Sequence, residues 1–181
     1  MSNQHFKKAA QLLESGKIIA FPTETVFGIG ALLNKPKAIR EIFKLKKRPR
    51  SKPLQVLIAT HKQAQELGHL TDKNLKFASK KWPGPYTFIV PKTRKVPKLV
   101  TGGSSKVGLR MPNHKAILKL IKEYGPIVAT SANQAGGPPA LTVKDVKKAL
   151  PELAFILPGR VKSGKASKVI DLTKGKKVLR A

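Results

Sequence analysis

The arrangement of apolar segments constrains the fold of this chain more than any other feature of its sequence. Short apolar runs that suit buried strands alternate with amphipathic stretches that suit helices, and loops rich in glycine and proline separate them. Their order lacks a regular strand–helix–strand rhythm, which predicts an α/β fold: a single domain over residues 1–181, with a twisted, mixed, open sheet flanked by helices. The expected strands cover residues 17–21, 54–59, 86–90, 107–110, 127–129, 155–157, 169–172 and 177–180.

Helix boundaries are indicated by capping residues and by proline. A helix must end by Arg48, because Pro49 disfavours helical geometry in the residue before it. Thr142, with Asp145 three residues later, forms a variant of the capping box at the start of another helix. The expected helices run from near the N-terminus to Gly16, from Pro36 to Arg48, and over 72–82, 114–123 and 144–150.

The charge of the chain points to anionic partners. Its 37 Lys and Arg residues outnumber 9 Asp and Glu residues, and the formal net charge is +28. Between Asp72 and Glu123 there are 13 basic residues and no acidic one, so local ion pairs cannot neutralise that stretch. Phosphate-bearing ligands are the natural counter-charge. Charge alone leaves three readings open: a nucleotide enzyme, an RNA-binding protein and a merely well-solvated surface.

Composition excludes several other classes. The chain has no cysteine, which excludes disulfides and thiolate zinc sites, and its four histidines are scattered. We therefore expect no metal site held by the protein alone. No apolar run approaches the roughly 20 residues that span a bilayer, so we expect no membrane segment and a cytoplasmic location.

Four segments carry candidate chemistry. Residues 22–30, Pro-Thr-Glu-Thr-Val-Phe-Gly-Ile-Gly, contain Thr23 and two glycines, and taken alone they favour a flexible turn. Residues 46–54 place lysines and arginines where a helix ends, which suits a triphosphate or equally a solvated basic face. Residues 130–133, Thr-Ser-Ala-Asn, could bond phosphate or their own backbone. Arg110 ends an apolar strand and, if buried, needs a carboxylate or phosphate partner; with so few acids in the chain, a ligand is a credible one.

Taken in register, these segments resemble the YrdC/Sua5 family of L-threonylcarbamoyladenylate synthases, in its short bacterial form. The resemblance runs from about residue 17 to residue 150 and includes Trp-Pro-Gly-Pro at 82–85. It implies a wide, positively charged cavity on an open sheet. It also implies that ATP, L-threonine and bicarbonate react to give threonylcarbamoyl-AMP and pyrophosphate, with Mg²⁺ carried by ATP as substrate. The product would reach adenosine 37 of tRNAs through a separate threonylcarbamoyl transferase complex.

The resemblance also assigns residues by position. It implies that Lys46 and Arg48 are catalytic and, with Ser131 and Asn133, bind ATP. It implies that Lys52 and Arg180 are further ATP contacts. It also implies that the substrate L-threonine is bound by Thr23, Arg110 and Ser167. The tail departs from the family pattern, since the usual Ser-Thr-Val reads Ser-Lys-Val at 167–169, and Lys106 stands where longer members often have threonine.

Two other functions remain as alternatives. The first is a non-catalytic RNA-binding or ribosome-maturation protein that binds tRNA or double-stranded RNA, which the net charge favours and the aromatic content of 6% disfavours. The second is a carbamoyl-transfer module of the kind found in hydrogenase maturation. Under the enzymatic reading we expect the cations Lys46 and Arg48 to be exposed, so that replacing both would abolish pyrophosphate release and barely change stability.

Overall fold

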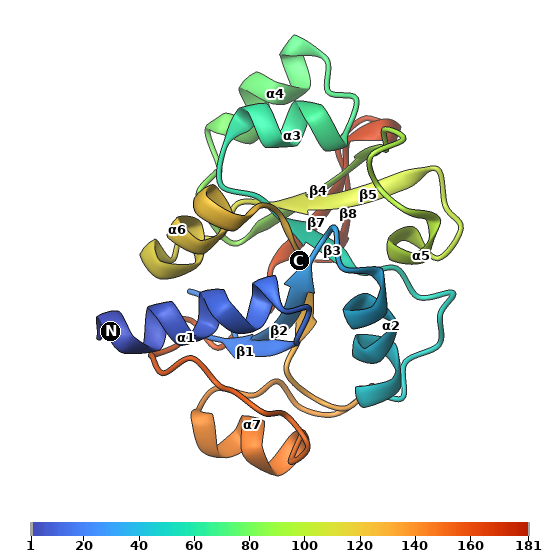
Figure 1. The fold of residues 1–181 in the computed structure, drawn as a ribbon. Coiled ribbons are helices and arrows are strands. Elements are labelled where there is room, and N and C mark those ends of the chain that lie inside the picture. Colours follow the sequence, from blue (N-terminus) through green and yellow to red (C-terminus); the bar gives the residue numbers. More distant parts are fainter. Residues whose placement is uncertain (1, 181) are drawn as a thin grey trace.

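The computed structural model describes residues 2–180, which form an α/β fold around one eight-stranded sheet (Figure 1). The strands lie in the order β1-β2-β6-β3-β5-β4-β7-β8. The pairs β3–β5 and β4–β7 are parallel and the other neighbours are antiparallel, so the sheet is mixed, as the sequence predicted. The strands are β1 (Ile19–Phe21), β2 (Gly28–Leu32), β3 (Gln55–Leu57), β4 (Tyr86–Pro91), β5 (Lys106–Arg110), β6 (Ile127–Ser131), β7 (Lys168–Asp171) and β8 (Lys177–Arg180).

Helices cover the sheet because each presents one apolar face to it. The helices are α1 (Asn3–Glu14), α2 (Pro36–Leu45), α3 (His61–Leu67), α4 (Asp72–Ser79), α5 (Lys98–Thr101), α6 (Lys115–Tyr124) and α7 (Val143–Ala149), with a 3-10 turn at Leu172–Lys174. The predicted capping box is confirmed, since the Thr142 side chain accepts from the Asp145 N–H and the Asp145 side chain accepts from the Thr142 N–H. Helices α3 and α5 were not foreseen, because each is too short to show a helical period.

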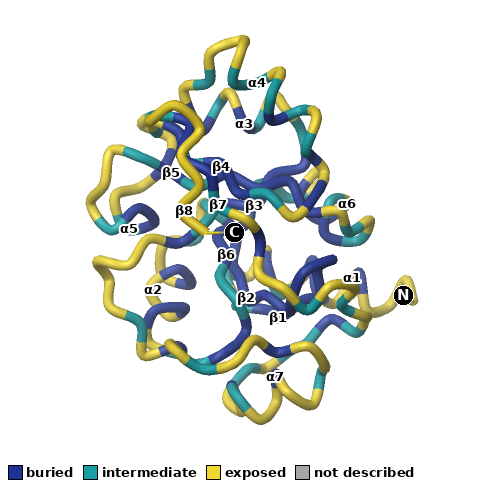
Figure 2. The backbone as a smooth tube through the Cα atoms, turned by 180° about the vertical axis from the view of Figure 1, so that it is seen from behind, coloured by how far each residue is buried: buried dark blue, intermediate teal, exposed yellow. Residues whose placement is uncertain are grey.

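Two clusters of buried side chains lie against the sheet. Helices α1 and α6 pack on alternate residues of β1, β3 and β6 and form the smaller cluster. Helices α2, α3, α4 and α7 contribute to the larger one, which runs along the opposite-facing residues of the same strands and of β4 and β5. Figure 2 shows that the central strands are buried and that exposed residues gather in the outer loops and helix surfaces. The face of β4, β5 and β7 that α1 and α6 leave open carries the cavity described below.

Two sequence predictions are wrong at the strand level. Residues 155–157 form no strand of the sheet and make only an isolated bridge, Ile156 beside Ala20. The glycines at 28 and 30 belong to strand β2 rather than to a flexible turn. Their physical role is close packing: a Cβ on Gly30 would lie 3.2 Å from the Phe21 ring and 2.6 Å from Ile127. The turn lies just before them, over Pro22 to Val26.

Candidate active site

A cavity of about 440 Å³ opens on the uncovered face of the sheet, within the usual size range for small-molecule sites. Its floor follows from strand alternation, because successive side chains of β5 point to opposite faces and Lys106, Gly108 and Arg110 share one of them. Their partners in β4, β3 and β7 face the same way. The floor and walls include Val26, Arg48, Leu54, Gln55, Thr87, Ile89, Ser104, Lys106, Gly108, Arg110, Thr130, Ser131, Ser167, Val169, Asp171 and Arg180.

Lys46 lies beneath one wall of this cavity, at the C-terminal end of α2. Its ammonium donates to the backbone carbonyls of Ser131, at 2.5 Å, and of Asn133. The side chain is 1% exposed, so our expectation of an exposed cation is wrong for Lys46. Burial, and to a lesser extent the charge of Arg48, lowers the pKa of Lys46 from 10.5 to about 8.

A Schellman turn directs Lys46 and Arg48 to different places. The N–H of Arg48 donates to the Phe43 carbonyl and that of Lys47 to the Lys44 carbonyl, the hydrogen-bond pattern of this motif. Lys47 has a φ of 50°, a left-handed conformation that glycine adopts more readily. The chain therefore turns sharply after Lys46. Arg48 is carried to the cavity wall, where its Nη2 donates to the Pro53 carbonyl at 2.9 Å.

The structure brings most of the predicted ATP-binding set together. Ser131 and Arg48 both line the cavity, and Asn133 follows two residues after Ser131, with its amide nitrogen donating to the carbonyls of Gln134 and Gly137. The side-chain oxygen of Asn133 is buried and lacks a hydrogen-bond partner among the described residues. Lys52 is exposed and does not line the cavity; its backbone carbonyl accepts from Nε of Arg48 at 3.3 Å.

Arg110, at the end of β5, is 3% exposed and forms an ion pair with Glu24. Its Nη2 donates to Oε1 of Glu24 at 2.8 Å and to the Thr25 hydroxyl at 2.8 Å. The carboxylate that the sequence argument required therefore comes from the chain itself. Burial lowers the pKa of Arg110, while the charge and hydrogen bond of Glu24 act in the opposite direction. Nε of Arg110 and Oε2 of Glu24 remain buried without partners among residues 2–180.

Thr23 lies in the turn that carries Glu24 rather than on the cavity wall. Its hydroxyl donates to the Val26 carbonyl at 2.8 Å and lies 2.8 Å from the Thr25 hydroxyl. The side chain is buried, and its bonds close the turn locally. Thr23 therefore supports Thr25, which in turn bonds Arg110.

Arg180 and Ser167 meet at the end of the cavity where Arg110 lies. Arg180, on strand β8, donates to the backbone and side-chain oxygens of Ser167 at 2.8 and 3.1 Å. Burial, and to a lesser extent the charge of Arg110, lowers the pKa of Arg180. The Ser167 hydroxyl lies 3.0 Å from that of Thr87.

Sequence reasoning missed several polar residues of the cavity. Thr87 on β4 bonds both Ser167 and Gln55, and Lys106 on β5 pairs with Asp171 at 3.1 Å. Each of these strand residues lies on the same face of the sheet as Arg110. The alternation of side chains along the strands could therefore have identified them. It could be applied only once the pairing of β4, β5 and β7 was known.

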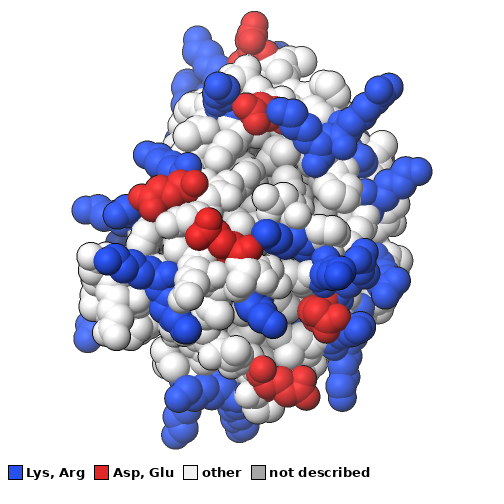
Figure 3. Space-filling model, in the orientation of Figure 1, with Lys and Arg blue, Asp and Glu red and all other residues white. Residues whose placement is uncertain are grey.

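Three general features of the described residues bear on function. Figure 3 shows basic side chains spread over the visible face with only a few acidic ones among them. Within residues 2–180, no group of three His, Cys, Asp or Glu side chains is placed to hold a metal ion. No helix in that part of the chain is both long and apolar enough to cross a membrane.

Comparison with known proteins adds independent findings. A family model named for Sua5, YciO and YrdC and described as "Telomere recombination" matches residues 11–181. A threonylcarbamoyl-AMP synthase of Vibrio campbellii is 34% identical over 182 residues, covering 98% of each chain. One from Pyrococcus abyssi is 39% identical over 94% of this chain, which spans 52% of that protein. The structure of P. abyssi Sua5 with L-threonine superposes with a TM-score of 0.91 at 37% identity, over 96% of this chain and 52% of that one.

Proposed function

Because this chain belongs to the Sua5/YciO/YrdC family, we propose that it is a threonylcarbamoyl-AMP synthase. The reaction joins L-threonine, bicarbonate and ATP and gives threonylcarbamoyl-AMP, pyrophosphate and water. The observation that carries the proposal is the placing of cations at two parts of one cavity: Arg110 and Arg180 at one end and Arg48 on the wall. The Vibrio campbellii relative, which matches this chain over 98% of both lengths, is named for the same activity.

Arg110 and its neighbours suit an amino acid. A guanidinium beside a carboxylate is complementary to a zwitterion, and the pair Arg110–Glu24 presents both charges at 2.8 Å from each other. Nε of Arg110 and Oε2 of Glu24 each retain unused hydrogen-bonding capacity. Ligand groups that satisfied these atoms would remove their burial cost. In this proposal Arg110 holds the threonine carboxylate, and Ser167 and Arg180 close the same end.

Arg48 and Lys46 suit the phosphates. The amine of threonine adds to carbon dioxide, which bicarbonate supplies by loss of water, and a carbamate forms. A carbamate oxygen then attacks the α-phosphorus of ATP, and the bond to the pyrophosphate oxygen breaks. Negative charge grows on phosphate oxygens during this step, and fixed cations stabilise it without reorganising. Arg48, Ser131 and Asn133 contact ATP in this proposal, and Lys46 adds a positive charge beneath them.

The residues of the cavity are compatible with a Mg²⁺ ion that binds together with ATP. The cavity wall contains the carboxylate of Asp171, both of whose oxygens already accept hydrogen bonds from Thr173 and Lys106. The ion would therefore bind chiefly to phosphate oxygens and water, as Mg²⁺ commonly does. When bound, it would supply charge neutralisation of the triphosphate.

The decisive test is pyrophosphate release by the full chain. Release should require both L-threonine and bicarbonate, and the second product should be threonylcarbamoyl-AMP by mass spectrometry. Replacing both Lys46 and Arg48 with Met should abolish release. Release that proceeds without threonine or bicarbonate would rule out the proposed reaction.

Partners beyond the substrates belong to the same proposal. The product is a labile mixed anhydride, so a transferase that places the threonylcarbamoyl group on adenosine 37 of tRNA has to consume it. The net charge of +28 also favours direct contact with tRNA or double-stranded RNA. RNA binding without synthesis is the alternative, and the pyrophosphate assay separates the two.

A further inference from the structure

We propose that five lysines beside the rings of Phe77 and Tyr86 form a docking surface for an anionic lipid bilayer. This lysine surface consists of Lys73, Lys80, Lys81, Lys168 and Lys176. It lies across the sheet from the cavity, because Thr87 and Val169 line the cavity and the residues that precede them, Tyr86 and Lys168, point to the opposite face. Docking there would leave the cavity open, so the inference is independent of the proposed reaction.

The half-buried ring of Phe77 brings distant parts of the chain together. The ammonium of Lys81 lies 5.5 Å from the centre of this ring, and that of Lys176, in the turn before β8, lies 4.5 Å from it. Lys73 and Lys80 come four residues before and three residues after Phe77, which places them on the same side of α4. Two segments far apart in the sequence therefore contribute to one basic cluster.

The lysine surface continues from α4 onto the sheet and carries charge of one sign. The ammonium of Lys81 lies 4.8 Å from the centre of the Tyr86 ring, and Lys168 is exposed on β7 beside Tyr86. Within residues 2–180, none of the five lysines has a carboxylate within ion-pair distance. Their mutual repulsion is therefore relieved by solvent ions or by an anionic partner.

The absence of arginine from this surface indicates the kind of partner. The segments that carry it, residues 72–81 and 168–177, contain lysines but no arginine. Protein–protein interfaces are enriched in arginine and depleted of lysine, and arginine is favoured where RNA phosphates are bound in a fixed geometry. A bilayer with anionic headgroups requires no fixed geometry, because its surface potential attracts each nearby lysine.

Exposed apolar side chains on β8 favour a bilayer over RNA. Val178 and Leu179 are 56% and 52% exposed, and they are two of the three large apolar side chains that are exposed in the described part of the chain. Val178 pairs with Ile170 and so points to the same face as Lys168. RNA phosphates offer such side chains no apolar contact, whereas a bilayer accepts them at the boundary between headgroups and acyl chains.

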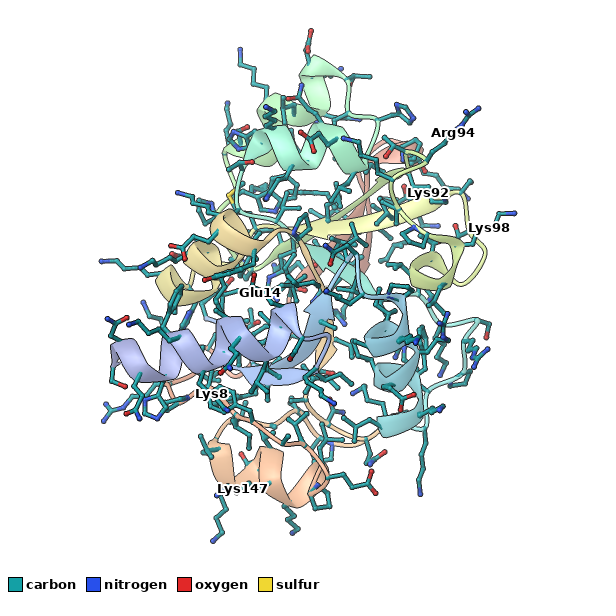
Figure 4. The ribbon with its side chains drawn as sticks, viewed as in Figure 1. Lys8, Glu14, Lys92, Arg94, Lys98 and Lys147 are labelled. Atoms are coloured by element: carbon teal, nitrogen blue, oxygen red, sulfur yellow. The ribbon has the colours of Figure 1, made fainter. Side chains whose placement is uncertain are left out.

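The test measures cosedimentation with vesicles of equal parts phosphatidylcholine and phosphatidylglycerol, in about 0.15 M salt. The surface variant neutralises three lysines around Phe77: Lys73→Gln, Lys80→Gln, Lys176→Gln. The matched control removes the same charge from α7, at the opposite end of the molecule from α4 (Figure 1): Lys144→Gln, Lys147→Gln, Lys148→Gln. Lys147 points away from the molecule in Figure 4. Thermal unfolding verifies that each variant is folded.

We expect the wild type to bind these vesicles and not to bind vesicles of phosphatidylcholine alone. The surface variant should lose affinity about a hundredfold, because each lysine near an anionic membrane contributes about fivefold. The α7 control should lose much less, although its net charge is the same. Equal losses in the two folded variants, or a wild type that does not bind the anionic vesicles, would overturn the docking surface.

Leu179→Trp tests whether the apolar side chains enter the bilayer. The single tryptophan of the chain, Trp82, is 6% exposed, so a change in emission on vesicle addition reports on position 179. The emission should shift to shorter wavelength and be quenched by lipids with brominated acyl chains. Bound protein without this shift, or a surface variant that loses affinity for duplex RNA but not for vesicles, would contradict the bilayer assignment. These measurements do not use turnover, so failure of the proposed reaction would leave their outcome unchanged.

Discussion

At the scale of single residues, the cavity depends on charges that are buried and held by specific partners. Arg110 pairs with Glu24, and Lys46 is held by backbone carbonyls of the β6 end. A buried ion pair is weak evidence for stability, but removing one partner leaves the other charge buried and uncompensated. Substitutions at these positions should therefore change stability as well as substrate binding, and suitable pairs of variants separate the two effects.

Arg110→Ala should raise the KM for threonine at least several-fold and leave the KM for ATP nearly unchanged, because the lost guanidinium is the proposed partner of the threonine carboxylate. It should also lower the free energy of unfolding by about 3 kcal/mol, because Glu24 loses its ion-pair partner. Steady-state kinetics and urea unfolding measure the two effects.

The double variant Arg110→Ala, Glu24→Gln provides the control. Neutralising Glu24 should recover part of the lost stability without restoring the low KM for threonine. A normal threonine dependence in folded Arg110→Ala would refute the threonine-binding role of Arg110.

Because of Lys46, the free energy of unfolding should rise with pH while the affinity for ATP falls. Its pKa is about 8 in the folded chain against an ordinary 10.5, so the unfolded chain binds more protons between these values. Stability from this group therefore rises with pH over that window, by up to about 3 kcal/mol. ATP binding should weaken over the same window as the positive charge disappears. Denaturant unfolding and the KM for ATP at pH 7 and 9.5 provide the measurement.

Lys46→Met isolates this contribution, because many other groups titrate above pH 9. The difference in unfolding free energy between wild type and Lys46→Met should change between pH 7 and 9.5 in favour of the wild type. A difference that stays constant with pH would mean that Lys46 keeps an ordinary pKa.

At the scale of elements, the end of α2 determines where the basic residues 46–48 lie. The Schellman turn there requires a left-handed residue, and the chain has Lys47 with a φ of 50° where glycine would fit without steric cost. The same turn sends Lys46 inward and Arg48 to the cavity wall. Strained backbone next to a functional group is common where that group must be held in one direction.

Lys47→Gly should therefore raise the free energy of unfolding by about 0.5–1 kcal/mol, because glycine relieves the left-handed strain. Pyrophosphate release should stay at the wild-type rate. Lys44→Gly, three residues earlier in the last turn of α2, should instead lower stability by up to about 1 kcal/mol. Opposite signs in denaturant unfolding support the account, whereas a loss of stability in both variants would contradict it.

At the scale of the whole molecule, the net charge of +28 and the cations of the cavity can be considered separately. Most cations lie on the outer surface, where they attract polyanions without geometric specificity, whereas Arg48, Lys106, Arg110 and Arg180 line the cavity. Arg94 and Lys98 are exposed, and Figure 4 shows both pointing away from the molecule. Loss of outer cations should therefore affect RNA binding more than synthesis.

The double variant Arg94→Gln, Lys98→Gln should lower the affinity for double-stranded RNA and reduce the slope of log Kobs against log salt by up to about two, because each lost phosphate contact removes about one unit. Pyrophosphate release should be unchanged. Arg48→Ala should do the reverse, with release impaired and the salt slope nearly kept. If Arg94→Gln, Lys98→Gln slowed pyrophosphate release as much as Arg48→Ala does, the separation between surface and cavity would be wrong.

The sequence alone determined the features that depend on neighbours along the chain. Short apolar runs predicted seven of the observed strands, and Thr142 with Asp145 predicted a capping box that the structure confirms. The motifs around Lys46, Arg110 and Ser131 predicted candidate site residues, of which Arg110 and Ser131 line the cavity and Lys46 bonds the Ser131 carbonyl. Strand β2 escaped prediction because its glycines resemble turn residues, and their presence is explained by the close packing of Phe21 and of strand β6 against them.

Only the tertiary structure decided which groups meet. Glu24 and Arg110 are 86 residues apart in sequence, and Lys46 and Asn133 are 87 apart. A local pattern reports residue type and spacing, whereas burial and pairing depend on strand order, which places β5 beside β3 and β4. For that reason the sequence could assign Lys46 to a basic segment but not to the interior. It likewise could not bring Lys106 and Asp171 together across the cavity floor.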